Sequence, residues 1–160
     1  MISYHACLLS STYVNHRGYR KNFERSGFPG IEKEFAEVNT FFSSSNASVV
    51  MDLSCASGFM TRRLVSHGNY KRVIAADLSL TMLREARQRC FLEKISPLPE
   101  FVRCDAAKLP FKTASLDAVH AGAAMHCWPQ LETALSEVYR VLKPGFYNYD
   151  CTLCTRMIFD

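Results

Sequence analysis

The sequence predicts an α/β fold with a doubly wound, mostly parallel sheet. From residue 49 onward, short apolar runs alternate with helical patterns, which is typical of strand–helix–strand units. The run at 116–124 is apolar nearly throughout, as expected of a strand that helices cover on both faces. A chain of 160 residues has room for one such domain and its core.

Strands are predicted where apolar residues run together, and helices where they recur at every third or fourth position. The predicted strands cover residues 49–53, 73–76, 101–104 and 116–124. The predicted helices cover residues 31–42, 59–67, a stretch from the capping residue Ser79 through Cys90, and a stretch from Pro129 to Pro144-Gly145. Ser79 suits a helix start because its hydroxyl can accept a hydrogen bond from a free backbone N–H.

Charge and hydropathy narrow the class of protein. The net charge is +4, and the Lys and Arg residues are scattered, so a nucleic-acid partner gains no support. No apolar stretch reaches the roughly 18 residues that a membrane span needs. Cys151 and Cys154 have the spacing of metal ligands, but no second pair or histidine follows, so no metal site is predicted.

The segment 49–64 carries the main functional signal. A predicted strand runs into the small residues Ser54, Ala56 and Gly58 and then into a helix, so the backbone can approach a ligand closely. The next strand ends in Asp77, where a carboxylate can accept hydrogen bonds from both hydroxyls of a ribose. Asp105 ends the third strand, where it could meet an adenine amino group.

The turn does not have the pattern of a phosphate site. Both the P-loop pattern and the G-x-G-x-x-G dinucleotide pattern are missing, which argues against a nicotinamide-dependent reductase. Asp52 precedes the turn and no basic residue lies within it. This balance suits a ligand without phosphates, including a cationic sulfonium.

Each candidate residue also has a plain structural interpretation. The loop could be an ordinary strand–helix turn, Asp77 could cap the next helix, and Asp105 could be a surface carboxylate. His120 lies in an apolar strand and is predicted to be a hydrogen-bonded core residue. His126 is a weak candidate for a catalytic base and is otherwise expected to pack under Trp128.

Four ordered motifs resemble those of class I S-adenosylmethionine-dependent methyltransferases. The first two, VVMDLSCASG and VIAADLSLTM, are similar to the family's nucleotide loop and its acidic motif. The other two, CDAAKLPFKTASLDAVHAG and RVLKPG, are similar to the type 11 and quinone-biosynthesis branch. With GFPGIEKEF and DAVHAGAAMHCWP, the chain resembles a group of chloroplast-targeted plant methyltransferases of uncharacterised substrate over about residues 18–145.

The resemblance implies a Rossmann-like methyltransferase fold, S-adenosylmethionine as cofactor and a small-molecule methyl acceptor, with a lipophilic, quinone-like or plastid metabolite as the expected kind. It also implies a chloroplast location, although the first 16 residues do not form a convincing transit peptide; a soluble intracellular protein is the other expectation. The resemblance leaves the oligomeric state open. The implied cofactor-binding residues are Asp52, Ser54, Ala56 and Gly58 around the methionine part, Asp77 and Leu78 at the ribose, and Asp105 and Ala106 at the adenine.

The chain departs from the family pattern at two places. Ser54 and Ala56 stand where the family has the first two loop glycines, and Ala56 is expected to crowd the methionine part. After Gly145 the sequence resembles an alternative end, so the C-terminal strands are expected to be incomplete and the run at 116–124 to lack its usual neighbour. Residues 151–159 could supply a replacement strand.

These observations predict three parts of the chain. Residues 1–45 form a loop and helix over the cofactor site, residues 46–145 form the S-adenosylmethionine-binding core, and residues 146–160 form a divergent tail. The predicted function is methyl transfer from S-adenosylmethionine to a small molecule. The alternative is a truncated, non-catalytic fragment or isoform that binds the cofactor weakly or not at all.

Overall fold

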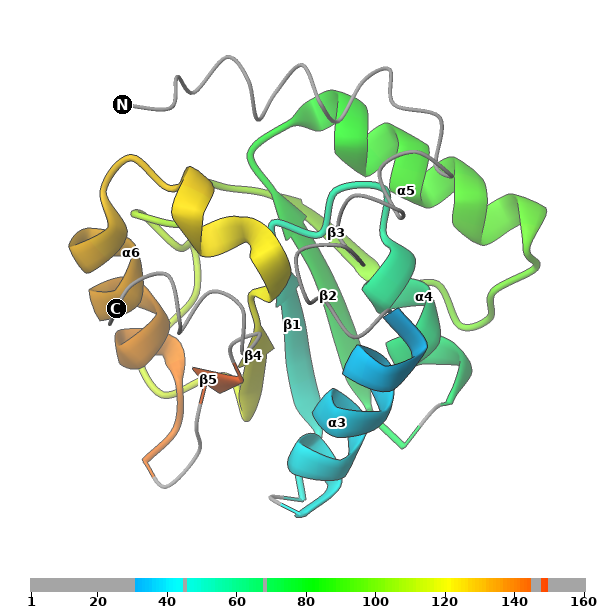
Figure 1. Ribbon diagram of the computed structural model, residues 1–160, viewed down its shortest axis with the longest axis horizontal. Coiled ribbons are helices and arrows are strands. Elements are labelled where there is room, and N and C mark those ends of the chain that lie inside the picture. The colour runs from blue at the N-terminus through cyan, green and yellow to red at the C-terminus, as the bar shows by residue number, and fades with distance from the viewer. Residues whose placement is uncertain (1–30, 45, 68, 145–147, 150–160) are drawn as a thin grey trace.

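A five-stranded sheet lies at the centre of the computed structural model, which describes residues 31–44, 46–67, 69–144 and 148–149 (Figure 1). The strand order is β3-β2-β1-β4-β5, and every neighbouring pair is parallel. The strands are β1 (Val49–Leu53), β2 (Arg72–Asp77), β3 (Glu100–Arg103), β4 (Ala118–His120) and β5 (Asn148–Tyr149).

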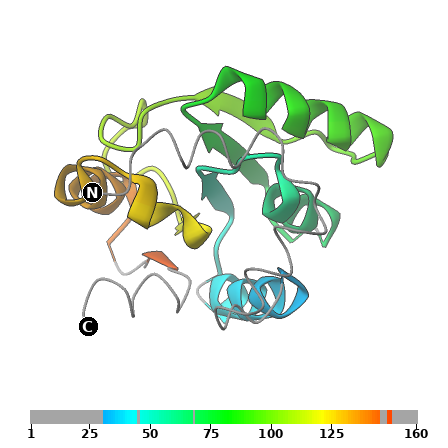
Figure 2. The ribbon, with the colours of Figure 1, turned by 45° about the horizontal axis from the view of Figure 1, so that its top comes forward.

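Helices lie on both faces of the sheet (Figure 2). They are α3 (Ile31–Ser44), α4 (Phe59–Ser66), α5 (Leu80–Leu92), the 3₁₀ helix η1 (Gly122–Cys127) and α6 (Leu131–Val141). Successive residues of a strand point to opposite faces, so β1 packs Val50 with α3 and α4 and Met51 with α6. Two buried layers therefore enclose the sheet, and the predicted doubly wound α/β fold is confirmed.

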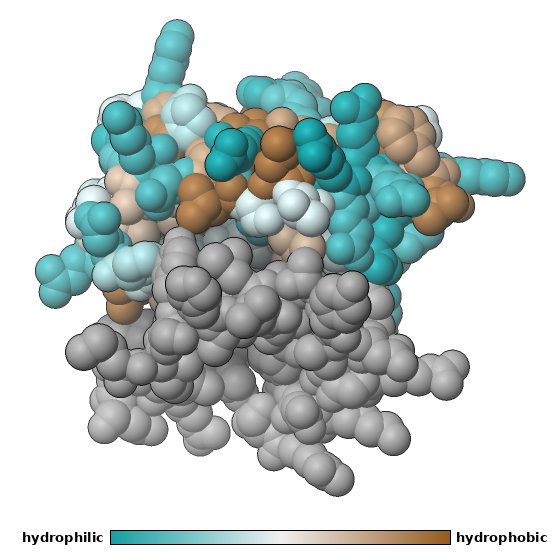
Figure 3. Space-filling model, turned by 90° about the horizontal axis from the view of Figure 1, so that it is seen from above, coloured by the Kyte–Doolittle hydropathy of each residue, from teal (hydrophilic) through white to brown (hydrophobic). Residues whose placement is uncertain are grey.

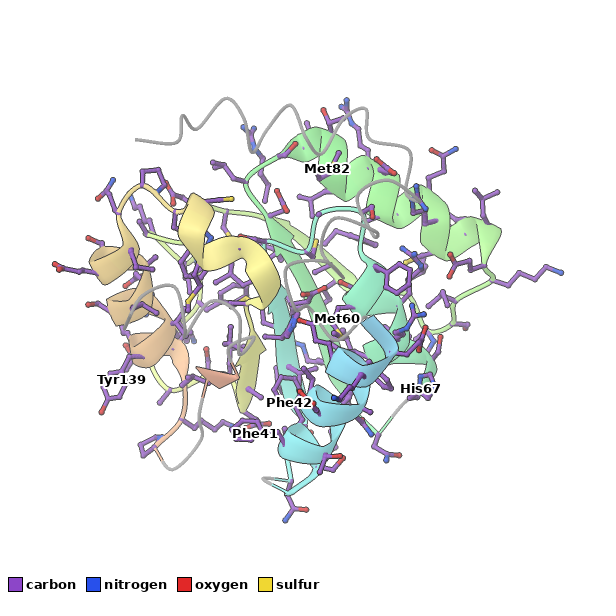
Figure 4. All side chains as sticks on the ribbon, in the orientation of Figure 1. Phe41, Phe42, Met60, His67, Met82 and Tyr139 are labelled. Atoms are coloured by element: carbon purple, nitrogen blue, oxygen red, sulfur yellow. The ribbon has the colours of Figure 1, made fainter. Side chains whose placement is uncertain are left out.

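The layer beneath α3 and α4 is the more aromatic of the two. Phe42 from α3 and Met60 from α4 both lie in the interior, whereas Tyr139 of α6 points away from the molecule (Figure 4). Phe42 is fully buried, and Tyr139 is 84% exposed. Burying a side chain of the size of Phe42 stabilises the fold by about 2–3 kcal/mol, which explains why α3 stays on the sheet.

The strand order places a switch point between β1 and β4. From β1 the chain builds outward through β2 and β3, then returns to the other side of β1 as β4. In open parallel sheets, ligands bind beyond the carboxyl ends of the strands at such a point. The β1–α4 loop, Asp77 and the β4–η1 turn all lie at this carboxyl edge of the sheet.

The opposite, amino edge of the sheet is held by Asp117. One of its carboxylate oxygens accepts hydrogen bonds from the backbone N–H groups of Ser48 and Val49, at 2.9 and 2.8 Å. Its other oxygen accepts one from the Lys143 ammonium at 2.6 Å. Burial raises the pKa of Asp117, but Lys143 and the two N–H groups outweigh this, so the pKa is lowered overall.

Most predicted elements are confirmed, with shifts at their ends. Ser79 caps α5 as predicted, because its hydroxyl accepts a hydrogen bond from the N–H of Met82 at 3.3 Å. The last helix begins at Leu131 rather than Pro129 and ends at Val141. Leu142 is extended and bridges to Leu116, so the prediction that it lies on the helix is wrong.

The predicted strand at 116–124 is too long. Only Ala118–His120 form β4, and residues 122–127 form η1 instead. An apolar run cannot by itself distinguish a buried strand from a buried turn, since both exclude water. On the outer side of β4, Asn148 and Tyr149 pair with Val119 and His120.

The predictions for residues 1–30, and for a strand at 151–159, lie outside the described residues. Of the predicted N-terminal part, α3 is described, and its role over the cofactor site stays a prediction. Among the helices described, none has the length and apolar character to cross a membrane.

Candidate functional site

The loop from β1 to α4 adopts a left-handed backbone at three alternate positions. The φ angles of Ser54, Ala56 and Gly58 are 60°, 47° and 70°. Glycine adopts this region without penalty, whereas a residue with a Cβ is strained there by about 1–2 kcal/mol. The turn therefore keeps the backbone of a glycine-rich loop although only Gly58 is a glycine.

Gly58 also meets a steric requirement. A Cβ added to it would lie 2.8 Å from the Cβ of Ala86, which is too close for two carbon atoms. The start of α4 thus lies directly against α5, and a larger residue at position 58 would separate the two helices.

Four hydrogen bonds hold the loop from different sides. The N–H of Cys55 donates to Ala76 O at 3.0 Å, and the N–H of Ala56 donates to Asp77 Oδ2 at 2.9 Å. The guanidinium of the buried Arg62 donates to Ser57 O at 2.7 Å. On the side of η1, the indole N–H of Trp128 donates to Ser54 Oγ at 3.0 Å.

Asp77 joins this loop to the start of α5. Its second oxygen, Oδ1, accepts a hydrogen bond from the N–H of Ser79 at 2.8 Å. Burial raises the pKa of Asp77, the bonds from Ser79 and Ala56 partly offset this, and the charge of Asp52 adds to the increase. A carboxylate has about four acceptor positions, so capacity for further hydrogen bonds remains beside the two N–H groups.

Asp105 and Leu78 lie at the same edge, beyond β3 and β2. Strand β3 continues beside Asp77, because the N–H of Cys104 donates to Asp77 O at 3.1 Å. Asp105 is exposed, and its Oδ1 accepts a hydrogen bond from the N–H of Ala107 at 2.9 Å. Leu78 is 43% exposed, whereas Ala106 is buried in the core beside α6.

Asp52 lies beneath the loop in a buried polar cluster with His120, Glu34 and Thr61. Its Oδ2 accepts a hydrogen bond from the Thr61 hydroxyl at 2.5 Å, and its Oδ1 lies 2.9 Å from His120 Nδ1. The other imidazole nitrogen, Nε2, lies 3.4 Å from Glu34 Oε1. Four elements, α3, β1, α4 and β4, therefore meet in this cluster.

The imidazole of His120 is held in its charged form. Burial alone lowers the pKa of His120, but the hydrogen bonds and negative charges of Asp52 and Glu34 outweigh it and raise the pKa to about 9. This buried cluster lies at the switch point between β1 and β4.

The turn after β4 fits closely around His120. A Cβ added to Gly122 would lie 2.9 Å from Cε1 and 3.2 Å from Nε2 of His120. The prediction that His120 is a hydrogen-bonded core residue is confirmed. Its partner Glu34 was missed, although it lies on the apolar face of α3 with Phe35 and Val38, an unusual position for a carboxylate.

Two predictions are not decided by the geometry, one on the role of His126 and one on a metal site at Cys151 and Cys154, which lie outside the described residues. His126 lies in η1, but its side chain is outside the described part of the chain, so its catalytic role stays a prediction. In that described part, no three acidic, histidine or cysteine side chains are arranged to hold a metal ion.

Figure 3 views the molecule from above Figure 1, onto the carboxyl edge of the sheet. Hydrophobic residues lie among hydrophilic ones on the described part of this face. The exposed Leu78 and Leu80 lie at this edge, since they follow the carboxyl end of β2. Together with Asp77 and Asp105, they give the edge both apolar and acidic groups.

Two known methyltransferases have sequences similar to this chain. A chloroplastic, uncharacterized methyltransferase of Arabidopsis thaliana is 40% identical over 139 residues, which is 84% of this chain and 39% of that protein. A ubiquinone/menaquinone biosynthesis C-methyltransferase of Brucella anthropi is 35% identical over 96 residues, 59% of this chain and 36% of that protein. The chain thus spans about two fifths of the length of these relatives.

A solved structure and a family model complete the comparison. The [4+2]-cyclase SpnF has a TM-score of 0.67 at 21% identity, over 74% of this chain and 43% of that one, which shows a shared fold and not a shared activity. The model of the family described as "Methyltransferase domain" matches residues 51–147, from β1 to the end of the α6–β5 connection. The chain therefore belongs to the methyltransferase-domain family.

Proposed function

We propose that this protein transfers a methyl group from S-adenosylmethionine to a small-molecule acceptor. The observation that carries the proposal is the left-handed loop after β1 bonded directly to Asp77, within a chain of the methyltransferase-domain family. Left-handed turns expose backbone groups for close approach, and a carboxylate with acceptor capacity suits the two hydroxyls of a ribose.

The residues present fit this donor. Asp77 would bind the ribose, with Leu78 beside it, and the exposed Asp105 with Ala106 would border the adenine. The residues of the β1–α4 loop would surround the methionine part, and Asp52 would support the loop from below. Asp77 and the exposed Asp105 give this edge acidic side chains, and no basic residue lies within the β1–α4 loop, which suits a cation better than an anion.

When bound, S-adenosylmethionine supplies a methyl group already activated on a sulfonium sulfur. The protein then acts mainly by orientation, which can contribute about 7–11 kcal/mol to lowering a barrier. Residues 31–42 and 122–129 would form the acceptor side, where His126 is the candidate base. The name of the Brucella relative supports a lipophilic acceptor of the quinone class, and the chloroplastic relative supports a chloroplast location.

Calorimetric titration with S-adenosylhomocysteine tests the proposal. We expect a dissociation constant of about micromolar order for the wild-type chain, weakened at least about tenfold by Asp77→Ala. Glu132→Ala, which removes an exposed carboxylate of α6, is the matched control and should bind as the wild type does. A folded wild-type chain that does not bind would overturn the proposal and favour the non-catalytic alternative.

A further inference from the structure

Ser54 makes a contact that a glycine at its position could not make. Its backbone has a left-handed φ of 60°, and its hydroxyl accepts the indole hydrogen bond of Trp128 at 3.0 Å. The two residues are 74 positions apart and belong to the β1–α4 loop and to the end of η1. Glycine would relax the backbone here but would leave the indole N–H without this partner.

Trp128 is fixed firmly to η1 and to the core. Its backbone N–H donates to Met125 O at 3.1 Å and ends η1. Its side chain packs on two buried clusters, one between the sheet and α6 and the other around Ala121 and Met125. Ser54 is therefore bonded to a side chain that is itself held by η1 and by the core.

The opposite side of the loop is bonded to Asp77 through the N–H of Ala56. Within residues 54–56, the chain thus contacts the carboxyl end of β2 on one side and η1 on the other. Asp77 and Trp128 are thus joined through residues 54–56 by two hydrogen bonds.

We propose that Trp128 is a positioning residue that couples the cofactor loop to η1 through its hydrogen bond with Ser54. Donor binding at Asp77 and the placement of the acceptor-side segment η1 then depend on each other. This inference rests on the proposed function, which places the donor at the loop. Because the chain has a single tryptophan, the emission of Trp128 reports on the coupling directly.

A double-mutant cycle on S-adenosylhomocysteine binding tests the coupling. Ser54→Gly removes the hydroxyl without adding backbone strain, and Trp128→Phe removes the N–H while it keeps most of the ring packing. We expect each variant to weaken binding by about two- to tenfold, the value of one hydrogen bond. The double variant should bind S-adenosylhomocysteine no more weakly than the single variant with the lower affinity, since the two substitutions remove the same hydrogen bond.

Two further variants separate positioning from stability. Ser54→Asn should restore affinity, because asparagine tolerates a left-handed backbone and its side-chain oxygen can accept the indole hydrogen bond. Tyr70→Phe removes the hydroxyl that donates to Asn39 Oδ1 at 2.9 Å, near the amino edge of the sheet, and should leave affinity unchanged. Saturating ligand should change the emission of Trp128 in the wild type and much less in Ser54→Gly.

The outcomes distinguish the inference from the proposed function. If the wild type binds but both single variants bind equally well, or their effects simply add, the coupling is overturned while the cofactor site stands. The coupling is also overturned if both single variants lose only thermal stability and Ser54→Gly keeps the change in Trp128 emission. If the folded wild type does not bind, both proposals fail.

Discussion

At the scale of single residues, the loop after β1 combines a glycine-type backbone with side chains that glycine lacks. Ser54 offsets part of its strain with the hydrogen bond from Trp128. Ala56 has no polar side-chain atom and so gains no such bond, although its backbone N–H is satisfied by Asp77. The left-handed backbone at Ala56 therefore lowers the stability of the fold, and no side-chain hydrogen bond offsets this loss.

Ala56→Gly is expected to raise the free energy of unfolding by about 0.5–1 kcal/mol. Relief of the strain at a φ of 47° exceeds the extra chain entropy that glycine brings to the unfolded state. Urea denaturation at neutral pH measures the change. Gly58→Ala is the opposite control and should lose more than about 1 kcal/mol, because the new Cβ meets Ala86. An unchanged or lower stability for Ala56→Gly would contradict the strain argument.

At the scale of elements, the β4–η1 turn and the buried cluster depend on each other. Strand β4 delivers His120 to Asp52 and Glu34, and the chain then turns at Gly122 directly over the imidazole. The helix α3 contributes only Glu34 to this cluster, yet that one contact ties the acceptor side of the proposed site to the switch point.

Gly122→Ala is expected to destabilise the fold by about 1–3 kcal/mol. Its Cβ would meet a buried ring that has no free space to move into. In a His120→Ala background the ring is gone, so the same change should cost much less. Thermal or urea unfolding of the four proteins measures this difference. Equal costs in both backgrounds would show that the turn does not pack on His120 as described.

In the molecule as a whole, the amino edge of the sheet stabilises the fold, whereas the carboxyl edge carries the proposed site. The amino edge is closed by Asp117, which ties the start of β1 to Lys143 after α6. The carboxyl edge holds the loop, the acidic residues and the buried cluster. Above neutral pH, the free energy of unfolding depends on the carboxyl edge, because the pKa of the buried His120 is raised to about 9 there.

The free energy of unfolding is expected to fall by about 3 kcal/mol between pH 6.5 and pH 9. His120 has a pKa of about 9 in the fold and 6.5 as its ordinary value, so its stabilising charge is fully present below pH 6.5 and is lost as the pH rises through 9. Urea unfolding at several pH values measures the slope. His120→Gln should lose stability at pH 6.5 and show little pH dependence in this window; a wild-type profile that is equally flat would refute the assignment.

The features that depend on local spacing follow from the amino-acid sequence alone. The alternation of apolar runs and helical periods gave the sheet and its helices, and the small residues and aspartates at strand ends located the loop, Asp77 and Asp105. The resemblance to the family's loop motif marked Ser54 and Ala56 as departures from a glycine pattern. The apolar run predicted too long a β4, because burial makes a strand and a turn equally apolar.

Contacts between residues far apart in the sequence become evident only in the folded chain. Glu34 and His120 are 86 positions apart, Asp52 and His120 are 68 apart, and Ser54 and Trp128 are 74 apart. Sequence spacing does not indicate such pairs. They form only when the strand order brings β4 beside β1 and when α3 and η1 pack around these two strands. Local periodicity fixes which face of an element is buried, whereas the partner on that face follows from how the whole chain packs.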